Sequence, residues 1–93
     1  MIVIVKSGPE TPEGRRAVKL SRDMAADLVL LQNGVYFACK DRLEGFCGTV
    51  HALEDDCRLR GLTENDLERD ISMIDYERLI DLMVAEEKVL GML

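Results

Sequence analysis

Four consecutive apolar residues, Leu28 to Leu31, are followed directly by Gln-Asn-Gly at positions 32–34. A continuous apolar run of this length, bounded by a turn signal, is typical of a strand that is buried on both faces. Strands of this kind occur in parallel sheets that helices cover on both sides. This stretch therefore predicts an α/β fold with the strand near the middle of the sheet.

Asn33-Gly34 has two interpretations. The pair is a strong hairpin signal between apolar segments, which would make residues 35–37 a return strand. Alternatively the chain turns at Gly34 and begins a short helix over 35–42, which the Ala-Cys-Lys-Asp run at 38–41 favours. We favour the strand–turn–helix interpretation and expect Gly34 to adopt a positive φ in a tight turn.

The rest of the chain alternates between strand and helix patterns. Further strands are predicted at 2–5, 49–53 and 71–74, and residues 89–93 form a short edge strand or a docked tail. Thr11 and Pro12 open a helix that ends near 25–26, and Asp75 caps the last helix. The apolar stripe of that last helix is predicted to contain Tyr76, Leu79, Ile80 and Met83. The alternation predicts an α/β/α sandwich around a parallel sheet of four to five strands.

Composition limits the partners and the location of the protein. The 93 residues make one domain, 1–93, and the net charge of −6 opposes direct binding to nucleic acid. Basic residues are scattered, and Arg15-Arg16, the longest basic run, is interpreted as a solvated helix face. The apolar run at 1–5 is too short for a signal peptide or a membrane span. Three cysteines cannot close a disulfide set, so we expect a reducing, cytoplasmic location.

The sequence offers little machinery for cofactors or metals. The run at 6–9, Lys-Ser-Gly-Pro, matches neither a phosphate loop nor a dinucleotide fingerprint, and we expect no cofactor. Glu54-Asp55-Asp56 is interpreted as a solvated helix start, favoured by the helix dipole, rather than a magnesium site. His51, the single histidine, lies within a predicted strand and is assigned a structural role. A zinc site built from Cys39, Cys47, His51 and Cys57 is disfavoured because the spacing contains no Cys-x-x-Cys pair.

The three cysteines differ in their expected positions. Cys39 follows the central strand and Cys57 follows the third strand, so both lie near the carboxyl edge of the sheet, where ligands of open α/β folds gather. Cys47 lies in a loop and is expected to be the most exposed. A helix N-terminus lowers a thiol pKa, but the acidic residues at 54–56 would raise the pKa of Cys57 again. A buried or incidental cysteine is the first interpretation for each, and a reactive thiol is the alternative.

Three segments together carry a family resemblance. They are Leu-Gln-Asn-Gly-Val-Tyr at 31–36, residues 50–56 with Arg-Gly-Leu at 60–62, and Ile-Asp-Tyr at 74–76 with Leu79, Asp81-Leu82 and Lys88-Val89. In this order and spacing they resemble the DsrH/TusB family of sulfur-relay proteins, within the DsrE/DsrF/DsrH-like superfamily. The resemblance runs from the first strand to the C-terminus.

The resemblance implies a small α/β/α fold with about five parallel strands and a strand-to-helix turn at Asn33-Gly34. It also implies assembly with related DsrE/DsrF-like (TusD/TusC-like) subunits into a hexameric sulfurtransferase. Complexes of the TusBCD type pass persulfide sulfur towards 2-thiolation of the tRNA wobble uridine, and the Dsr-type relatives work in sulfur oxidation.

This chain departs from the pattern of the sulfur-carrying relatives. Their acceptor cysteine lies at the end of the third strand, which corresponds here to Leu53-Glu54. Some DsrH proteins carry a cysteine in the first helix, and the matching stretch at 17–19 has none. We therefore expect a non-catalytic subunit, with no catalytic residue assigned. The alternatives are a persulfide carrier that uses Cys57 or Cys39, and a homo-oligomeric module that binds a small ligand near Gly8, Gly34 and Glu54.

Overall fold

The computed structural model describes residues 1–91 and contains a five-stranded, all-parallel sheet. The strands are β1 (Ile2–Val5), β2 (Asp27–Leu30), β3 (Val50–Leu53), β4 (Ile71–Ile74) and β5 (Val89–Leu90), in the order β4-β3-β2-β1-β5. The predicted central strand is confirmed as β2, whose residues 28–30 are fully buried. The predicted edge strand is confirmed for Val89–Leu90, which pair with β1. Positions 92–93 of that prediction lie outside the described residues.

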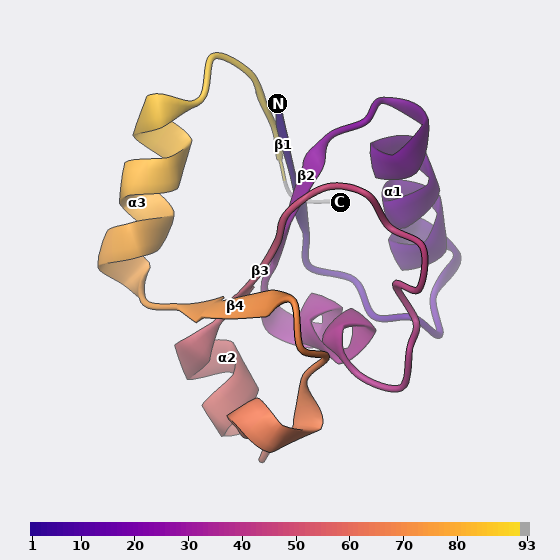
Figure 1. The fold of residues 1–93 in the computed structure, drawn as a ribbon, viewed down its shortest axis with the longest axis vertical. Helices are drawn as coiled ribbons and strands as arrows, with labels where there is room; N and C mark the ends of the chain where they lie inside the picture. The colour runs from indigo at the N-terminus through magenta and orange to yellow at the C-terminus, as the bar shows by residue number, and fades with distance from the viewer. Residues whose placement is uncertain (92–93) are drawn as a thin grey trace.

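Helices flank the sheet on both sides. They are α1 (Pro12–Asp23), α2 (Glu54–Leu59) and α3 (Tyr76–Ala85), with 3-10 helices η1 (Gln32–Ala38) and η2 (Glu64–Asp66). In Figure 1, α1 and α3 lie on opposite sides of the sheet, and α2 lies below it, next to η1. The chain moves across the sheet one strand at a time from β1 to β4. The connection through α3 then returns to place β5 on the free side of β1.

The helix starts follow the local rules predicted from sequence. Pro12 occupies the first position of α1, where its missing N–H leaves no hydrogen bond unmade, and the Thr11 hydroxyl accepts a bond from the Gly14 N–H at 3.0 Å. Asp75 caps α3 by accepting the Arg78 N–H at 2.8 Å. Helix α1 ends at Asp23, earlier than expected, because Ala25 adopts a left-handed φ of 53°.

The side chains of the sheet form two separate apolar layers. One layer packs against α1 and η1 and consists mainly of Val3, Val5, Leu28, Leu30, Val50 and Ala52 from the strands, with Ala17, Val18, Val35 and Ala38 from the helices. The other layer packs against α3 and consists of Ile2, Ile4, Val29, Leu53, Ile74 and Leu79. Alternation along each strand sends successive side chains to opposite layers. The second layer is smaller because, in the part of the chain that the structure describes, α3 is the single helix on that face.

The segment after β2 differs in detail from its prediction. A turn followed by a helix is confirmed, but the helix is a 3-10 helix at Gln32–Ala38 rather than a helix over 35–42. The expected positive φ at Gly34 is wrong, and Gln32 carries the left-handed φ of 49° instead. Glycine is required at position 34 for space, since a Cβ there would lie 2.2 Å from the Val5 carbonyl oxygen.

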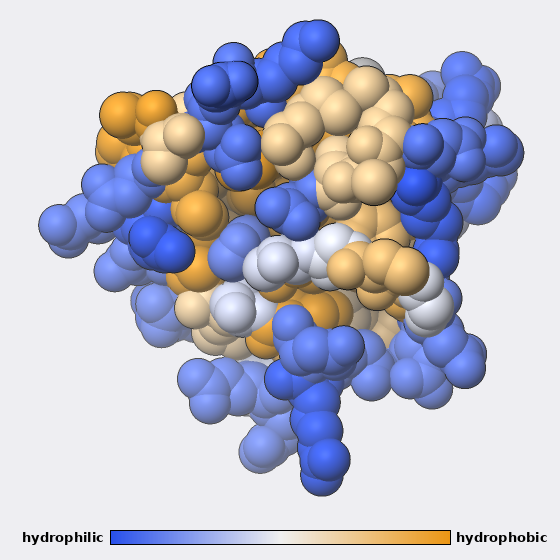
Figure 2. Space-filling model, turned by 45° about the horizontal axis from the view of Figure 1, so that its top comes forward, coloured by the Kyte–Doolittle hydropathy of each residue, from blue (hydrophilic) through white to orange (hydrophobic). Residues whose placement is uncertain are grey.

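The predicted apolar stripe of α3 is divided between the core and the surface. Leu79 is buried, whereas Tyr76, Ile80 and Met83 are 40–59% exposed. Val84 is 80% exposed and extends the exposed row. The space-filling view shows hydrophobic surface among polar side chains on the left, the side on which α3 lies (Figure 2). Within residues 1–91, no helix has the length and apolar content that crossing a bilayer requires.

Candidate functional site

The carboxyl ends of the central strands meet the turn that begins η1. The Leu31 N–H donates to the Val5 carbonyl at 2.9 Å, and the Gly34 N–H donates to the Lys6 carbonyl at 3.1 Å. These bonds hold the start of η1 directly against the end of β1. The carboxyl edge is where open α/β sheets place their ligands, so its side chains are the first candidates for a site.

Asp56 joins α2 to this turn. Its Oδ2 accepts the Gln32 N–H at 2.7 Å, and the Arg60 guanidinium donates to the Asp56 carbonyl at 3.0 Å and to the Asn33 side-chain oxygen at 3.0 Å. The expectation that all of Glu54-Asp55-Asp56 is solvated is therefore wrong for Asp56, which is only 9% exposed. Its carboxylate stabilises the strained backbone of Gln32 through this hydrogen bond. The two residues are far apart in sequence, so the helix-start pattern does not reveal the bond.

Cys57 is fully buried in the layer between the sheet and η1. Burial raises the pKa of its thiol to about 11, and the nearby Cys39 and Asp56 act in the same direction. With this pKa, only about one thiol in ten thousand is a thiolate at pH 7. The position next to the carboxyl edge is as expected, but the side chain has neither the exposure nor the ionisation of a reactive cysteine.

Cys39 lies at the end of η1 and is 7% exposed. Its side chain lines a groove of about 530 Å³, together with Tyr36, Arg42 and Leu62 among others. Burial raises the pKa of Cys39, and the positive charge of Arg42 partly opposes that rise. Of the two candidate acceptors, Cys39 is the one that a ligand in a groove can approach.

Cys47 occupies the loop before β3, near the amino ends of the strands, and is exposed as expected. Its Sγ lies 3.6 Å from the Gly45 carbonyl oxygen, which it contacts as a weak donor. This position is at the opposite end of the strands from Cys39 and Cys57. Cys47 is therefore not part of the carboxyl-edge site.

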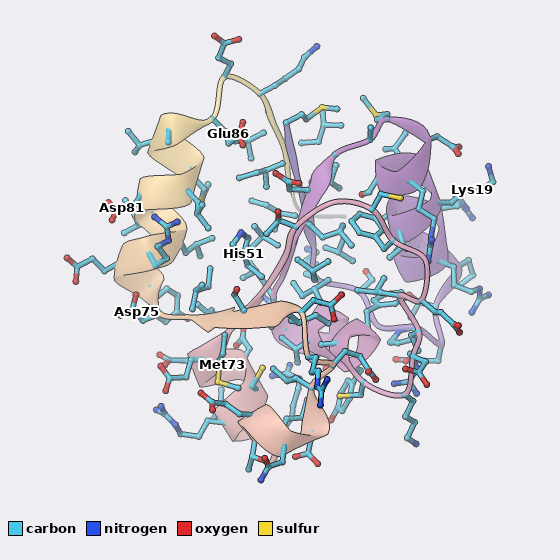
Figure 3. The ribbon with its side chains drawn as sticks, viewed as in Figure 1. Lys19, His51, Met73, Asp75, Asp81 and Glu86 are labelled. Carbon is cyan, nitrogen blue, oxygen red and sulfur yellow. The ribbon has the colours of Figure 1, made fainter. Side chains whose placement is uncertain are left out.

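His51 lies in β3 beside Val29 and Ser72, on the face of the sheet that α3 covers (Figure 3). Its Nδ1 is buried and has no hydrogen-bond partner among the described residues. Burial lowers the pKa of the imidazole, Arg78 lowers it further, and Asp27 acts in the opposite direction. Cys57 lies on the other face, so the sheet separates two of the four zinc candidates. No three His, Cys, Asp or Glu side chains in residues 1–91 are arranged to hold a metal ion.

Comparison with known protein families agrees with the fold described above. A model of the family described as "DsrH like protein" matches residues 13–89. The chain belongs to the DsrH-like family. Membership confirms the predicted resemblance to sulfur-relay proteins. The match begins at the second residue of α1 and ends at the first residue of β5, so it leaves out β1.

Several solved structures are similar to this DsrH-like chain over nearly its whole length. YchN from E. coli superposes with a TM-score of 0.82 at 16% identity, covering 99% of this chain and 97% of YchN, which shows the fold alone. The solution structure of Tm0979 from Thermotoga maritima is 33% identical, with a TM-score of 0.69 and coverage of 98% and 100%. A second NMR structure of TM0979, described as a candidate sulfur transferase, gives 37% identity, a TM-score of 0.65 and coverage of 96% and 97%. No curated protein matches the chain at significant similarity.

Proposed function

We propose that this DsrH-like chain is a non-catalytic subunit of a cytoplasmic sulfur-relay complex. In this role it supports persulfide transfer towards tRNA wobble-uridine 2-thiolation or sulfur oxidation, and related DsrE/DsrF-like chains carry the sulfur. The observation on which the proposal depends is the exposed apolar face of α3. Family membership supports the sulfur-relay context.

The α3 surface consists of Tyr76, Ile80, Met83 and Val84, which follow one another at helical spacing and are each at least 40% exposed. A contiguous apolar face on a small domain marks an interaction site, because exposing it to water lowers stability and solubility. Among the helices of residues 1–91, α3 alone packs over its face of the sheet. A related subunit could cover both α3 and the partly buried side chains beside it, such as Leu31 and Leu82.

The state of the thiols supports a non-catalytic role. A sulfur acceptor acts as a thiolate, and burial raises the pKa of both Cys57 and Cys39. Neither side chain is more than 7% exposed. Protein surfaces that hand sulfur from one chain to the next need an accessible thiolate, and the burial and raised pKa of Cys39 and Cys57 both oppose its formation.

Assembly can be tested with a matched pair of variants. Val84→Asp places a charge on the α3 surface, and Leu59→Asp places the same charge on an apolar side chain of equal exposure in α2, 81% against 80%. Each variant is co-expressed with the DsrE/DsrF-like chains of the same genome, and co-purification is measured. We expect Val84→Asp alone to abolish the complex. Retention of the complex in Val84→Asp, or equal loss in both variants, would contradict the α3 assignment.

A second candidate function is a persulfide carrier at Cys39, which the groove beside Arg42 favours. The Cys39 thiolate would attack the terminal sulfur of a donor persulfide. A new S–S bond forms at Cys39, the donor S–S bond breaks, and the donor leaves as a thiolate with no net oxidation. Incubation with a cysteine desulfurase and cysteine, followed by alkylation and peptide mapping, decides between the two. Sulfur on Cys39 that Cys39→Ser removes would establish a carrier, and no sulfur on any cysteine supports the assembly role.

A further inference from the structure

Basic residues that are scattered along the sequence lie together on one face of helix α1. Arg15, Lys19 and Arg22 follow at intervals of four and three residues and therefore share one face of the helix. Arg42, from the segment after η1, lies across from them. The four basic residues line one shallow, widely open groove of about 490 Å³, here called the α1 groove, with Pro9, Val18 and Phe37. No acidic side chain of the described residues belongs to this lining. The interpretation of Arg15 as part of a merely solvated face is therefore incomplete.

The three arginines are held in place without being neutralised. Arg15 donates to the Pro9 carbonyl at 3.1 Å, and Arg42 donates to the Tyr36 carbonyl at 2.7 Å. Arg22 donates to the Glu44 carbonyl at 3.3 Å and stacks over the Phe46 ring with 5.5 Å to its centroid.

Within residues 1–91, none of the three forms an ion pair with a carboxylate. Lys19 differs, since it pairs with Asp23 at 3.0 Å on the outer side of α1, where Figure 3 shows it projecting away from the sheet. A carbonyl orients a guanidinium but carries no net charge, so the groove retains three uncompensated positive charges.

The spacing of the charges excludes a single small anion as the best fit. Arg15 and Arg22 lie about 10 Å apart along the helix axis, and their guanidinium groups are bonded to different carbonyls, those of Pro9 and Glu44, so in this arrangement one phosphate or sulfate does not bridge them. Two or more negative groups on an extended ligand match this separation. The buried side chains of Val18 and Phe37 form an apolar floor between them.

The same features favour a protein segment over a nucleic acid as the ligand of the α1 groove. Among the described residues, the lining contains a single aromatic ring, Phe37, whereas single-stranded nucleic acid is held by several rings on which successive bases stack. The net charge of −6 repels a long polyanion, whereas a short segment interacts mainly with charges within the screening length of about 8 Å. An apolar side chain of the ligand would fill the floor between the arginines.

We propose that the α1 groove binds an extended acidic segment of a partner protein, in which an apolar side chain lies between carboxylates. Charge complementarity selects the acidic residues, and the Val18–Phe37 floor selects the apolar one. This surface is separate from the α3 surface, and the proposal does not require this chain to carry sulfur. A protein with −6 net charge thereby retains a local site that attracts another acidic chain.

The test uses the full chain and a short fluorescein-labelled peptide in which pairs of Glu alternate with Leu. Binding is followed by fluorescence anisotropy at low and physiological salt. The variant Arg15→Gln/Arg22→Gln removes two groove charges, and Arg16→Gln/Arg69→Gln removes two exposed charges that do not line the groove. Arg42 is left unchanged because it also lines the Cys39 groove. Circular dichroism and the melting temperature of each variant establish that it is folded.

We expect the groove variant to weaken binding roughly tenfold and the control variant to change it less than about twofold. Binding should also weaken as salt is added. Equal weakening in both variants would overturn the proposal, since only overall charge would then matter. The proposal would also be overturned if the peptide did not bind, or if a peptide with Gln in place of Glu bound equally well. Tighter binding of a short RNA that displaces the peptide would overturn it too.

Discussion

Replacement of Gly34 is expected to be among the most damaging single changes in this chain. An added Cβ would lie 2.2 Å from the Val5 carbonyl oxygen, against an ordinary contact distance of at least 3.4 Å. The Val5 carbonyl cannot simply retreat, because it accepts the Leu31 N–H at 2.9 Å and belongs to the fully buried β1. Relief therefore requires η1 to shift by more than 1 Å, the difference between those two contact distances.

The shift would have two energetic consequences. It would stretch or break the 3.1 Å bond from the Gly34 N–H to the Lys6 carbonyl. Overpacking in a closely packed core costs about 1–3 kcal/mol, and a lost backbone bond adds about 1 kcal/mol. We therefore expect Gly34→Ala to lower the free energy of unfolding by about 3 kcal/mol, and its melting temperature by roughly 12–24 °C.

Urea denaturation followed by circular dichroism measures this loss. Gly61→Ala, at φ 71° with no atom of residues 1–91 within 4 Å of the new Cβ, isolates the cost of a left-handed backbone, which is about 1 kcal/mol. Gly91→Ala, whose new Cβ meets no atom of the described residues within 4 Å, should be close to neutral. A Gly34→Ala protein within 0.5 kcal/mol or so of the wild type, or one more stable than Gly61→Ala, would refute the steric argument.

Three further outcomes follow from the buried polar groups and thiols. Asp56→Ala should lower the free energy of unfolding by about 1.5–3 kcal/mol in urea denaturation, because the Gln32 N–H loses a charged acceptor, whereas Asp55→Ala should change it little. The lowered pKa of His51 means that the unfolded chain takes up its proton first as the pH falls; stability should therefore decline below about pH 6.5. His51→Gln should flatten this decline between about pH 6.5 and 5, and an unchanged profile would show that another group is responsible. Ellman's reagent at pH 7 should label Cys47 at once and Cys57 only after unfolding, and rapid labelling of Cys57 in the folded chain would contradict its burial.

The elements of this fold follow from interactions between near neighbours in sequence. A run such as Ile2–Val5 has no polar residue to expose, so it must become a buried strand wherever the chain folds. Pro12 at the first helical position and Asp75 before the last helix act through bonds within one turn. These features are present in the local sequence, and they were sufficient to predict the all-parallel sheet, its central strand and the carboxyl-edge position of Cys39 and Cys57.

The properties of the candidate surfaces depend on residues that are distant in sequence. Asp56 is buried because the Gln32 N–H reaches it, and Gly34 is needed because the Val5 carbonyl lies against it. The helical period of α3 predicts an amphipathic helix, but it does not show that Leu79 alone would be buried. That outcome depends on how the helix sits on the sheet.

Sequence alone therefore determined the secondary-structure pattern, the α/β class and the family of this chain, because these depend on residue type and spacing along the chain. Tertiary structure decided the burial of Cys57, the exposed face of α3 and the α1 groove. In the groove, Arg42 joins α1 residues that are at least 20 positions earlier in the chain. Burial and charge clustering depend on which segments pack together, and that packing is a property of the whole fold.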